Sequence, residues 1–290
     1  MSTDQVEFTP SELLATHDRL EPLVADGRHC HGGFDATGAY RSPRTLHRTP
    51  AIEAWQARHA DTGAELLSID LASFPEHYPN VEQTRHLLRA GVREPVVSIL
   101  TRIGTVEGFG AFLRHSIVPD LQRHFDDDIT GTAIAHLDRG LIEAHARDEA
   151  GFEDEAGHNL MWFAARDIAF ERPVTENQTK LMLERMGITG PGGKVDLAAM
   201  RAAAIAARKL PSDIDFDVEA LIERMARLML IEITAFHAFT WAETILGDPE
   251  LVAGDGEAGQ IVSYIRADET PHVAYLQTVL SEMRARAFAG

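Results

Sequence analysis

The sequence Asp268-Glu269-Thr270-Pro271-His272 has Asp, Glu and His at the same three positions as an earlier sequence, Asp154-Glu155-Ala156-Gly157-His158. Residues three positions apart lie on the same face of an α-helix, so each copy would present a carboxylate and an imidazole side by side. Such a pair suits a first-row transition metal ion. One Glu-x-x-His sequence arises readily by chance, whereas two copies, each preceded by Asp, indicate a shared site on two helices.

Both copies continue apolar helix faces, so both are predicted to point into a core. Glu155 and His158 continue one such face, and Glu269 and His272 continue another. The apolar residues of the first face are Leu137, Leu141, Phe152 and Trp162, and those of the second are Val262, Ile265, Leu276 and Val279. Burying an ionised carboxylate is costly unless a counter-charge is present, and a bound dication supplies that charge.

Two more carboxylates, Glu107 and Glu232, lie on apolar faces of two other predicted helices. In an antiparallel hairpin, residues at equal depth share a sequence midpoint that falls in the turn. The midpoint of Glu107 and Glu155 is residue 131, and that of Glu232 and Glu269 is 250.5; both lie in predicted turns. Six side chains at one level are therefore predicted to hold two metal ions, namely Glu107, Glu155, His158, Glu232, Glu269 and His272. Three carboxylates could replace Glu107, namely Glu94, Asp120 and Glu143, whereas Glu223 and Glu243 lie at the wrong depth to replace Glu232.

Apolar residues recur at three- and four-residue steps from residue 95 onward, which is typical of helices. The chain is therefore predicted to be all-α, with two helical hairpins that form a four-helix bundle. The predicted helices span about residues 96–125, with a kink at Pro119, 132–170, 216–246 and 257–288, and a connecting helix spans 196–210. Residues 1–93 are predicted to be an extension that packs on the bundle, residues 94–290, within one structural domain. The extension holds helices over 11–25 and 51–67, separated by a loop rich in Gly, His and Pro.

This pattern resembles the ferritin-like di-iron carboxylate superfamily, whose bundle takes one Glu from each of two helices and Glu-x-x-His from each of the others. The resemblance covers about residues 95 to 286 and implies a ferritin-like bundle around two iron ions, or manganese or a mixed pair. The Asp before each motif is closer to the bacterial multicomponent monooxygenase, ribonucleotide reductase small-subunit and acyl carrier protein desaturase branch than to ferritin itself. It implies that Asp154 and Asp268 orient the ligand His of the opposite motif. Pro271 departs from the usual pattern and should distort the fourth helix.

Five further residues are candidates for the surroundings of the site: His145, Asp148, Trp162, His237 and Tyr275. For His145, Asp148 and His237, a core position or a contact with a ligand residue is favoured over direct metal binding. Trp162 follows His158 by four residues, where a ribonucleotide reductase small subunit would carry its radical Tyr, but a core position is favoured. Tyr275 is a weak radical candidate.

The composition excludes several classes of protein. The chain of 290 residues has 27 Lys+Arg against 45 Asp+Glu, a net charge of −18, which disfavours binding to nucleic acid or to an anionic membrane. The single cysteine, Cys30, excludes an internal disulfide, a four-Cys metal site and a thiolate-held iron–sulfur cluster. His29-Cys30-His31 could bind metal, although a mobile flap is favoured for this loop. The sequence shows no signal peptide, and its most apolar stretch, 228–241, is too short for a bilayer, so we expect a cytoplasmic protein.

The resemblance implies an O2-dependent oxidase or oxygenase that acts on a small or medium organic molecule. The candidate partners are a reductase, a carrier protein and a second copy of the chain in a homodimer. One alternative is ferritin- or rubrerythrin-like iron oxidation, storage or peroxide detoxification; another is a non-catalytic metal- or ligand-binding helical protein. The 93 residues before the bundle argue against storage, and the single cysteine excludes the four-Cys module of rubrerythrin.

Overall fold

The protein belongs to the all-α class, as the sequence predicts. The structure, a computed structural model, describes residues 8–17, 23–25, 27–30, 32–69, 78–185 and 197–289. Within these residues the strands are two residues long and form two antiparallel pairs near the N-terminus. Helices therefore carry the architecture, and the assignment to the ferritin-like fold stays a prediction.

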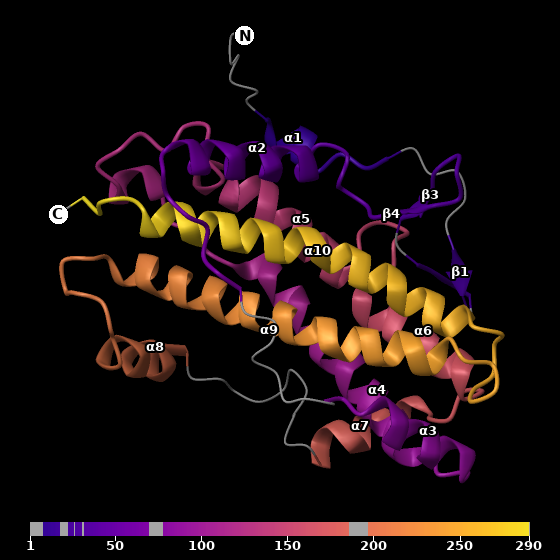
Figure 1. Cartoon of the computed structure of the whole chain (residues 1–290). Helices are drawn as coiled ribbons and strands as arrows, with labels where there is room; N and C mark the ends of the chain where they lie inside the picture. Colours follow the sequence, from indigo (N-terminus) through magenta and orange to yellow (C-terminus); the bar gives the residue numbers. More distant parts are fainter. Residues whose placement is uncertain are drawn as a thin grey trace.

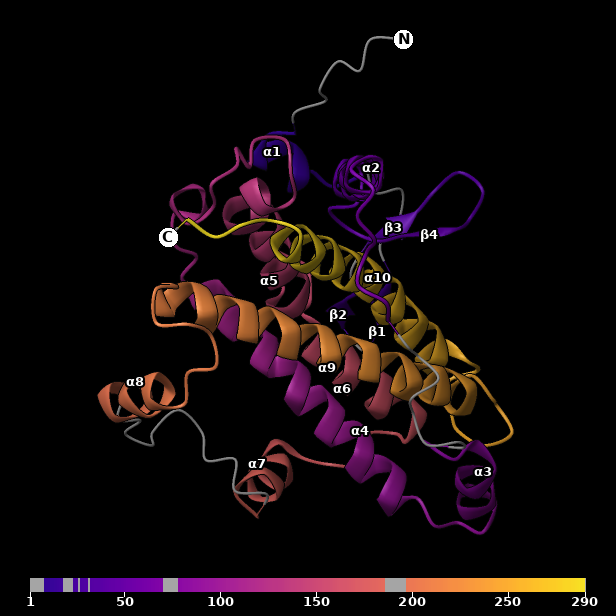
Figure 2. The ribbon, with the colours of Figure 1, turned by 60° about the vertical axis from the view of Figure 1, so that its left-hand side comes forward.

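Two long helices form the centre of the molecule. Helix α9 (Phe216–Leu246) and helix α10 (Glu257–Arg284) run in opposite directions side by side, as Figures 1 and 2 both show. Helix α4 (Glu94–Glu107) packs on α6 (His158–Ala169), which also contacts α10. Helix α4 continues as the 3₁₀ helix η2 (Gly108–His115), which packs on α5 (Glu143–Ala150). These elements enclose the interior from which the candidate site is built.

The predicted helix over 132–170 is wrong as one continuous element. Its residues form a 3₁₀ turn, η4 (Ile134–His136), a π-helical stretch, η5 (Leu137–Ile142), and then α5 and α6, with a loop over 151–157 between the last two. Gly151 has φ +77°, which favours glycine, and a Cβ on Gly157 would lie 2.4 Å from the carbonyl oxygen of Glu149. The two glycines thus allow the chain to fold tightly back on the end of α5.

The other long helices agree more closely with the predictions. Helix α9 has the predicted bounds, and α10 begins at the predicted residue but ends four residues earlier. Pro271, which is expected to distort this helix, lies inside α10 without ending it. The first predicted helix, over 96–125, is instead α4 followed by η2 and, after Pro119, by the 3₁₀ turn η3 (Leu121–His124).

The N-terminal part is less helical than predicted. Helix α1 (Pro10–Leu13) covers only the start of the predicted helix over 11–25, and α2 (Arg48–Asp61) ends before residue 67. Between them lie four short strands, β1 (Val24–Ala25), β2 (Arg28–His29), β3 (Gly33–Phe34) and β4 (Tyr40–Arg41), paired as β1–β2 and β3–β4. Helix α2 lies along α10 (Figure 1). The remaining helices are α3 (Val81–Arg89), α7 (Glu176–Arg185) and α8 (Leu197–Ala206), the last within the predicted connecting helix.

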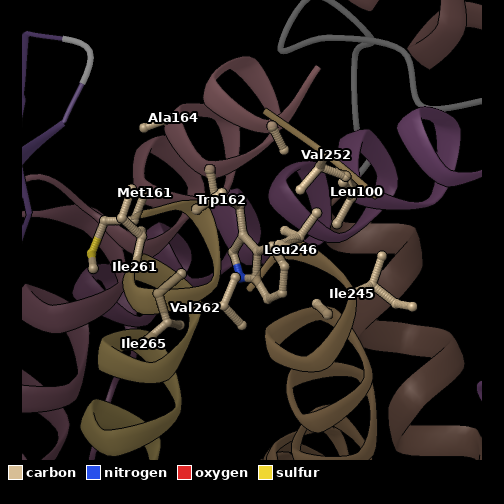
Figure 3. Packing of buried hydrophobic residues seen from close by; sticks show 14 of the residues in the cluster. Leu100, Met161, Trp162, Ala164, Ile245, Leu246, Val252, Ile261, Val262 and Ile265 are labelled. Carbon is tan, nitrogen blue, oxygen red and sulfur yellow. The ribbon is translucent and has the colours of Figure 1, made fainter. Parts of the chain in front are cut away.

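The apolar interior consists of two clusters. In the first, Trp162 packs among side chains of α4, α9 and α10, including Leu100, Leu246 and Val262 (Figure 3). The second lies around Trp55 and includes Leu137, Leu141, Met225, Leu276 and Val279. On α9 the residues of the second cluster precede those of the first, and on α10 the order is reversed. A middle section of each helix therefore separates the two clusters. The candidate site lies at this middle level.

One helical stretch in the described part of the chain, Glu94–His115, is apolar and long enough to cross a bilayer by length and composition alone. A third of its most apolar window is buried inside the structure. It consists of α4 and η2, which pack on α6 and α5, and an interior helix passes the same test.

Candidate metal centre

Seven His and Glu side chains of the described residues gather in two adjoining groups. The first group is Glu107, Glu149, His158 and Glu269, and the second is His145, Glu149, Glu232, Glu269 and His272. Within each group, one oxygen or nitrogen atom from every residue lies within 4.8 Å of all the others. Because Glu149 and Glu269 belong to both groups, the two groups form one continuous cluster.

Each side chain owes its place to a helix position. His145 and Glu149 lie four residues apart on α5, and Glu269 and His272 lie three apart on α10, so each pair shares one helix face. Glu107 is the last residue of α4, and His158 is the first residue of α6. Glu232 lies in the middle of α9, between the two apolar clusters.

In the first group, the carboxylates surround Nδ1 of His158. This nitrogen lies 2.9 Å from Oε1 of Glu269, 3.3 Å from Oε1 of Glu149 and 3.9 Å from Oε2 of Glu107. His158 is fully buried, whereas the side chain of Glu107 is 13% exposed. The first group is therefore more open to its surroundings at Glu107.

The second group contains two imidazoles stacked on each other. The rings of His145 and His272 lie 3.6 Å apart between centroids, at an angle of 13°. Nε2 of His145 lies 3.2 Å from Oε1 of Glu232, and Nδ1 of His272 lies 2.5 Å from Oε2 of Glu269. The hydroxyl of Tyr275 lies 3.0 Å from Nδ1 of His145, which leaves Nε2 as the nitrogen that points to the carboxylates.

Two aspartates face the Nε2 atoms of His272 and His158. Oδ2 of Asp148 lies 2.9 Å from Nε2 of His272, and Oδ2 of Asp268 lies 3.5 Å from Nε2 of His158. Tyr40 of β4 donates a hydrogen bond of 2.8 Å to Oδ1 of Asp268. In both histidines Nδ1 is thus directed to the cluster while Nε2 faces an aspartate; for His272 the hydrogen bond to Asp148 also orients the ring.

Two arginines from the segment before and within α2 neutralise the outer carboxylates. Arg44 bonds to Asp148 and, over 2.6 Å, to Glu155, and Arg48 donates to Asp148 over 2.9 Å. Burial opposes the ionisation of Asp148, but Arg48 and Arg44 hold its pKa well below the usual range. All four side chains are buried, so these contacts form an internal ion-pair network beside the cluster.

Within the cluster, burial and neighbouring charges shift the pKa values of the side chains. Burial and the charge of Glu232 raise the pKa of Glu269 well above its usual range, and burial together with the charge of His145 lowers the pKa of His272 to about 3. Both shifts favour the neutral forms of these two side chains, which lie 2.5 Å apart. Burial alone would lower the pKa of His145, but hydrogen bonds to Glu149 and Glu232 raise it to about 9. Carboxylates crowded in this way favour a cation among them.

The structure places two of the predicted site residues outside the His/Glu cluster. Glu155 lies in the loop before α6 and pairs with Arg44; it is in neither His/Glu group. Glu149, six residues earlier, lies in both groups. Asp154 is exposed on the surface, and Asp148 instead contacts His272. The other predicted ligands, Glu107, His158, Glu232, Glu269 and His272, lie together in the cluster.

The sequence contains a signal for the missed residues. Asp148-Glu149 repeats the Asp-Glu pair of Asp268-Glu269, and His145 lies four residues before Glu149. The midpoint of Glu107 and Glu149 is residue 128, which lies in the same predicted turn as residue 131. The hairpin argument therefore could not distinguish Glu149 from Glu155.

The remaining candidates have varied surroundings. Trp162 is fully buried in the first apolar cluster, against Phe239. Tyr275 contacts His145, and His237 lines a cavity described below. Cys30 is buried, and burial raises the pKa of its thiol to about 12, so it is a poor source of thiolate. His31 lies outside the described residues.

No family model, curated protein or solved structure matches the chain. The chemistry of the donor set is therefore the basis for its interpretation. Imidazole and carboxylate donors together suit iron, manganese and zinc, and the absence of thiolate among the donors fits the first two well. The residues present fit a pair of such ions, because each group offers at least four donors and the two groups share two carboxylates.

Proposed function

We propose that the protein binds two divalent transition metal ions, most simply iron, and that it is an oxidoreductase that uses O2 to oxidise an organic molecule. The observation that carries the proposal is the sharing of Glu149 and Glu269 between two buried donor groups. Shared carboxylates are the means by which helical bundles hold metal ions in pairs. A mixed manganese and iron pair would use the same residues.

Charge supports two ions rather than one. The cluster contains four glutamates, and two divalent ions would supply four positive charges among them. Glu269 would give up its proton on becoming a ligand, so metal binding should release protons. The ion pairs of Asp148 and Glu155 with Arg44 and Arg48 are complete without a metal, which leaves the four glutamates of the cluster to be balanced.

The residues of the chain would prepare the site for this chemistry. Asp148 and Asp268 keep Nε2 of His272 and His158 engaged, so that Nδ1 of each ring can bind metal. The apolar clusters on either side exclude water from the interior. A bound ferrous pair would supply the electrons and the open coordination positions needed to activate O2.

Metal titration tests the proposal. Anaerobic addition of ferrous ion to the purified, chelator-treated protein should saturate at about two ions per chain. Glu149→Ala should lower the stoichiometry to about one or less, because it removes a donor from both groups. Glu153→Ala is the matched control: this residue is exposed, lies four positions away, and should leave the titration unchanged. Exposing the loaded protein to O2 in an oxygen electrode cell should then consume O2.

Three outcomes would count against the proposal. Failure to bind iron or manganese would leave a non-catalytic helical protein. Unchanged stoichiometry in Glu149→Ala would overturn the assignment of the shared ligand. Iron uptake far above two ions per chain, in a large shell seen by size-exclusion chromatography, would favour iron storage.

A further inference from the structure

A cavity of about 1170 Å³ lies between helices α3, α4 and α9. Its lining is mainly apolar and includes Ile99 and Val106 of α4 and Leu230 and Ile231 of α9. Each of these four side chains is more than 40% exposed, although each is large and hydrophobic. A concave surface that presents several such side chains together is typical of a binding site for an organic molecule.

The cavity reaches the metal centre. Glu107, which belongs to the first His/Glu group, also lines the cavity, and its side chain is the most exposed in the cluster. The lining on α4 extends from Pro95 to Glu107, a span of about 18 Å at the rise of an α-helix. The cavity is therefore long, and one end of it lies beside the more open metal position.

One cationic side chain of the lining is available to a ligand. Arg102 lines the cavity and is exposed, and within the described part of the chain no carboxylate pairs with it. Other arginines of this acidic chain, such as Arg85 and Arg227, have carboxylate partners. A guanidinium that has no carboxylate partner among the described residues, in the lining of an apolar cavity, is suited to bind the anionic group of an amphipathic molecule.

We propose that the cavity binds an elongated, largely hydrocarbon molecule with one anionic group. The anionic group pairs with Arg102, and the hydrocarbon part lies between α4 and α9 as far as Glu107. This inference deepens the proposed function and rests on it for one point, that the molecule is the organic substrate of the metal centre. Substrate would then approach the metal position held by Glu107 and His158.

Binding of dodecanoate and of 1-dodecanol, measured by isothermal titration calorimetry on the full chain, tests the cavity. Both should bind the wild-type protein at about one per chain, and both should change the fluorescence of Trp241, which lines the cavity. Arg102→Gln should weaken dodecanoate binding about tenfold, through loss of a charge-assisted bond, and leave 1-dodecanol unaffected. Arg89→Gln is the matched control, since this arginine is exposed on α3 outside the lining.

A variant that fills the cavity tests the position of the hydrocarbon part. Ile103→Trp should weaken both ligands at least tenfold with unchanged helicity by circular dichroism; Ala235→Phe serves the same purpose if Ile103→Trp does not fold. In proton NMR, dodecanoate resonances should broaden more with the Mn(II)-loaded protein than with the Zn(II)-loaded protein, because the ligand ends near Glu107.

Several results would overturn the inference. These are absence of saturable binding, equal losses for both ligands in Arg102→Gln, or no difference between the Mn(II) and Zn(II) forms. Unchanged dodecanoate binding in the cavity-filling variants, together with sedimentation of the protein with phosphatidylcholine vesicles, would instead assign the apolar surface to a membrane. Repeating the dodecanoate titration in the presence of EDTA distinguishes the two proposals. If the protein does not bind iron but still binds dodecanoate in EDTA, the cavity proposal is retained and the metal centre is rejected.

Discussion

Asp148 is the residue at which the outer contacts of the His/Glu cluster converge. Its carboxylate accepts bonds from Arg44 and Arg48 and contacts His272, and it is fully buried. Arg44 also pairs with Glu155. Two guanidinium groups thus balance two carboxylates in the interior, which explains how Glu155 can lie on an inward face without a metal ion.

Arg44→Met should destabilise the protein by about 3 to 5 kcal/mol. The substitution leaves two buried carboxylates with only one cationic partner, and removing one member of a buried pair costs about this much. Urea denaturation monitored by circular dichroism measures the change. Arg41→Met is the control, since Arg41 pairs with Asp35 at the surface and the loss there should stay below about 1 kcal/mol. Equal losses in the two variants would contradict the role of the buried network.

Single residues also show how far the sequence could define the site. Glu269 and His272 lie on an uninterrupted helix, so periodicity alone places both on one face. Glu155 and His158 look equivalent in sequence, but the chain leaves the helix at Gly151 and enters the next at His158. A helical face cannot be extrapolated across such a break. The partner of Glu155, Arg44, is 111 residues away, and no local pattern predicts that contact.

At the scale of the elements, the backbone of η2, which continues α4, lies close to Glu149, a residue of both His/Glu groups. A Cβ built on Gly110 of η2 would lie 2.4 Å from Oε2 of Glu149, whereas one on Gly108 would meet only Asn159 at ordinary contact distances of 3.5 Å or more. The absence of a side chain at position 110 therefore sets the space in which Glu149 lies. From the sequence alone, the glycines in that segment indicate only a low helix propensity.

Gly110→Ala should weaken metal binding about tenfold, because the added methyl group displaces the carboxylate of Glu149. Competition with a chromophoric chelator measures the affinity. Gly108→Ala adds the same methyl group in the neighbouring turn and should keep the wild-type affinity. If the two variants bind metal equally well, the contact at position 110 does not constrain Glu149.

Helix α10 contacts the start of η4 through Glu282, a carboxylate outside the His/Glu cluster. Glu282 accepts hydrogen bonds from the backbone N–H groups of Ala133 and Ile134, at the start of η4. Its side chain is almost fully buried, and burial raises its pKa to about 7. The periodicity of α10 predicts the burial, but the pairing with a turn some 150 residues earlier depends on the tertiary fold.

Glu282→Gln should change the pH dependence of stability. The folded-state pKa of Glu282, about 7, lies above its ordinary value of 4.5, so the folded protein retains a proton that the unfolded chain loses. Stability from this group is present below about pH 4.5 and falls by roughly 3 kcal/mol as the pH rises to 7. Relative to wild type, Glu282→Gln should gain stability by that amount between pH 4.5 and 7.5 in urea denaturation. A difference that does not vary with pH would contradict the raised pKa.

At the scale of the whole molecule, the His/Glu cluster lies between two apolar clusters that share α9 and α10. The class and the two long helices follow from the periodicity of the sequence. The short strands, the 3₁₀ and π-helical stretches and the cavity do not, because they depend on packing between distant segments. Metal ions at the middle level would join both halves of the interior.

Metal binding should therefore stabilise the whole fold. Ligands that bind only the folded state raise the free energy of unfolding by about 2.7 kcal/mol at a concentration one hundred times Kd. Anaerobic Mn(II) or Fe(II) should raise the melting temperature, and EDTA should reverse the increase. Glu149→Ala should lose most of the effect, whereas Glu153→Ala should retain it. A melting temperature that does not respond to metal in the wild-type protein would contradict a folded-state metal site.

The hydrogen bond from Tyr40 to Asp268 joins residues 228 positions apart. During synthesis at about 5 to 20 residues per second, some tens of seconds or less separate the first of these residues from the second. Arg44 and Arg48 are made well before Glu269 and His272. The two donor groups are therefore complete only once Glu269 and His272 have been made, and any metal that needs both groups would bind after that point.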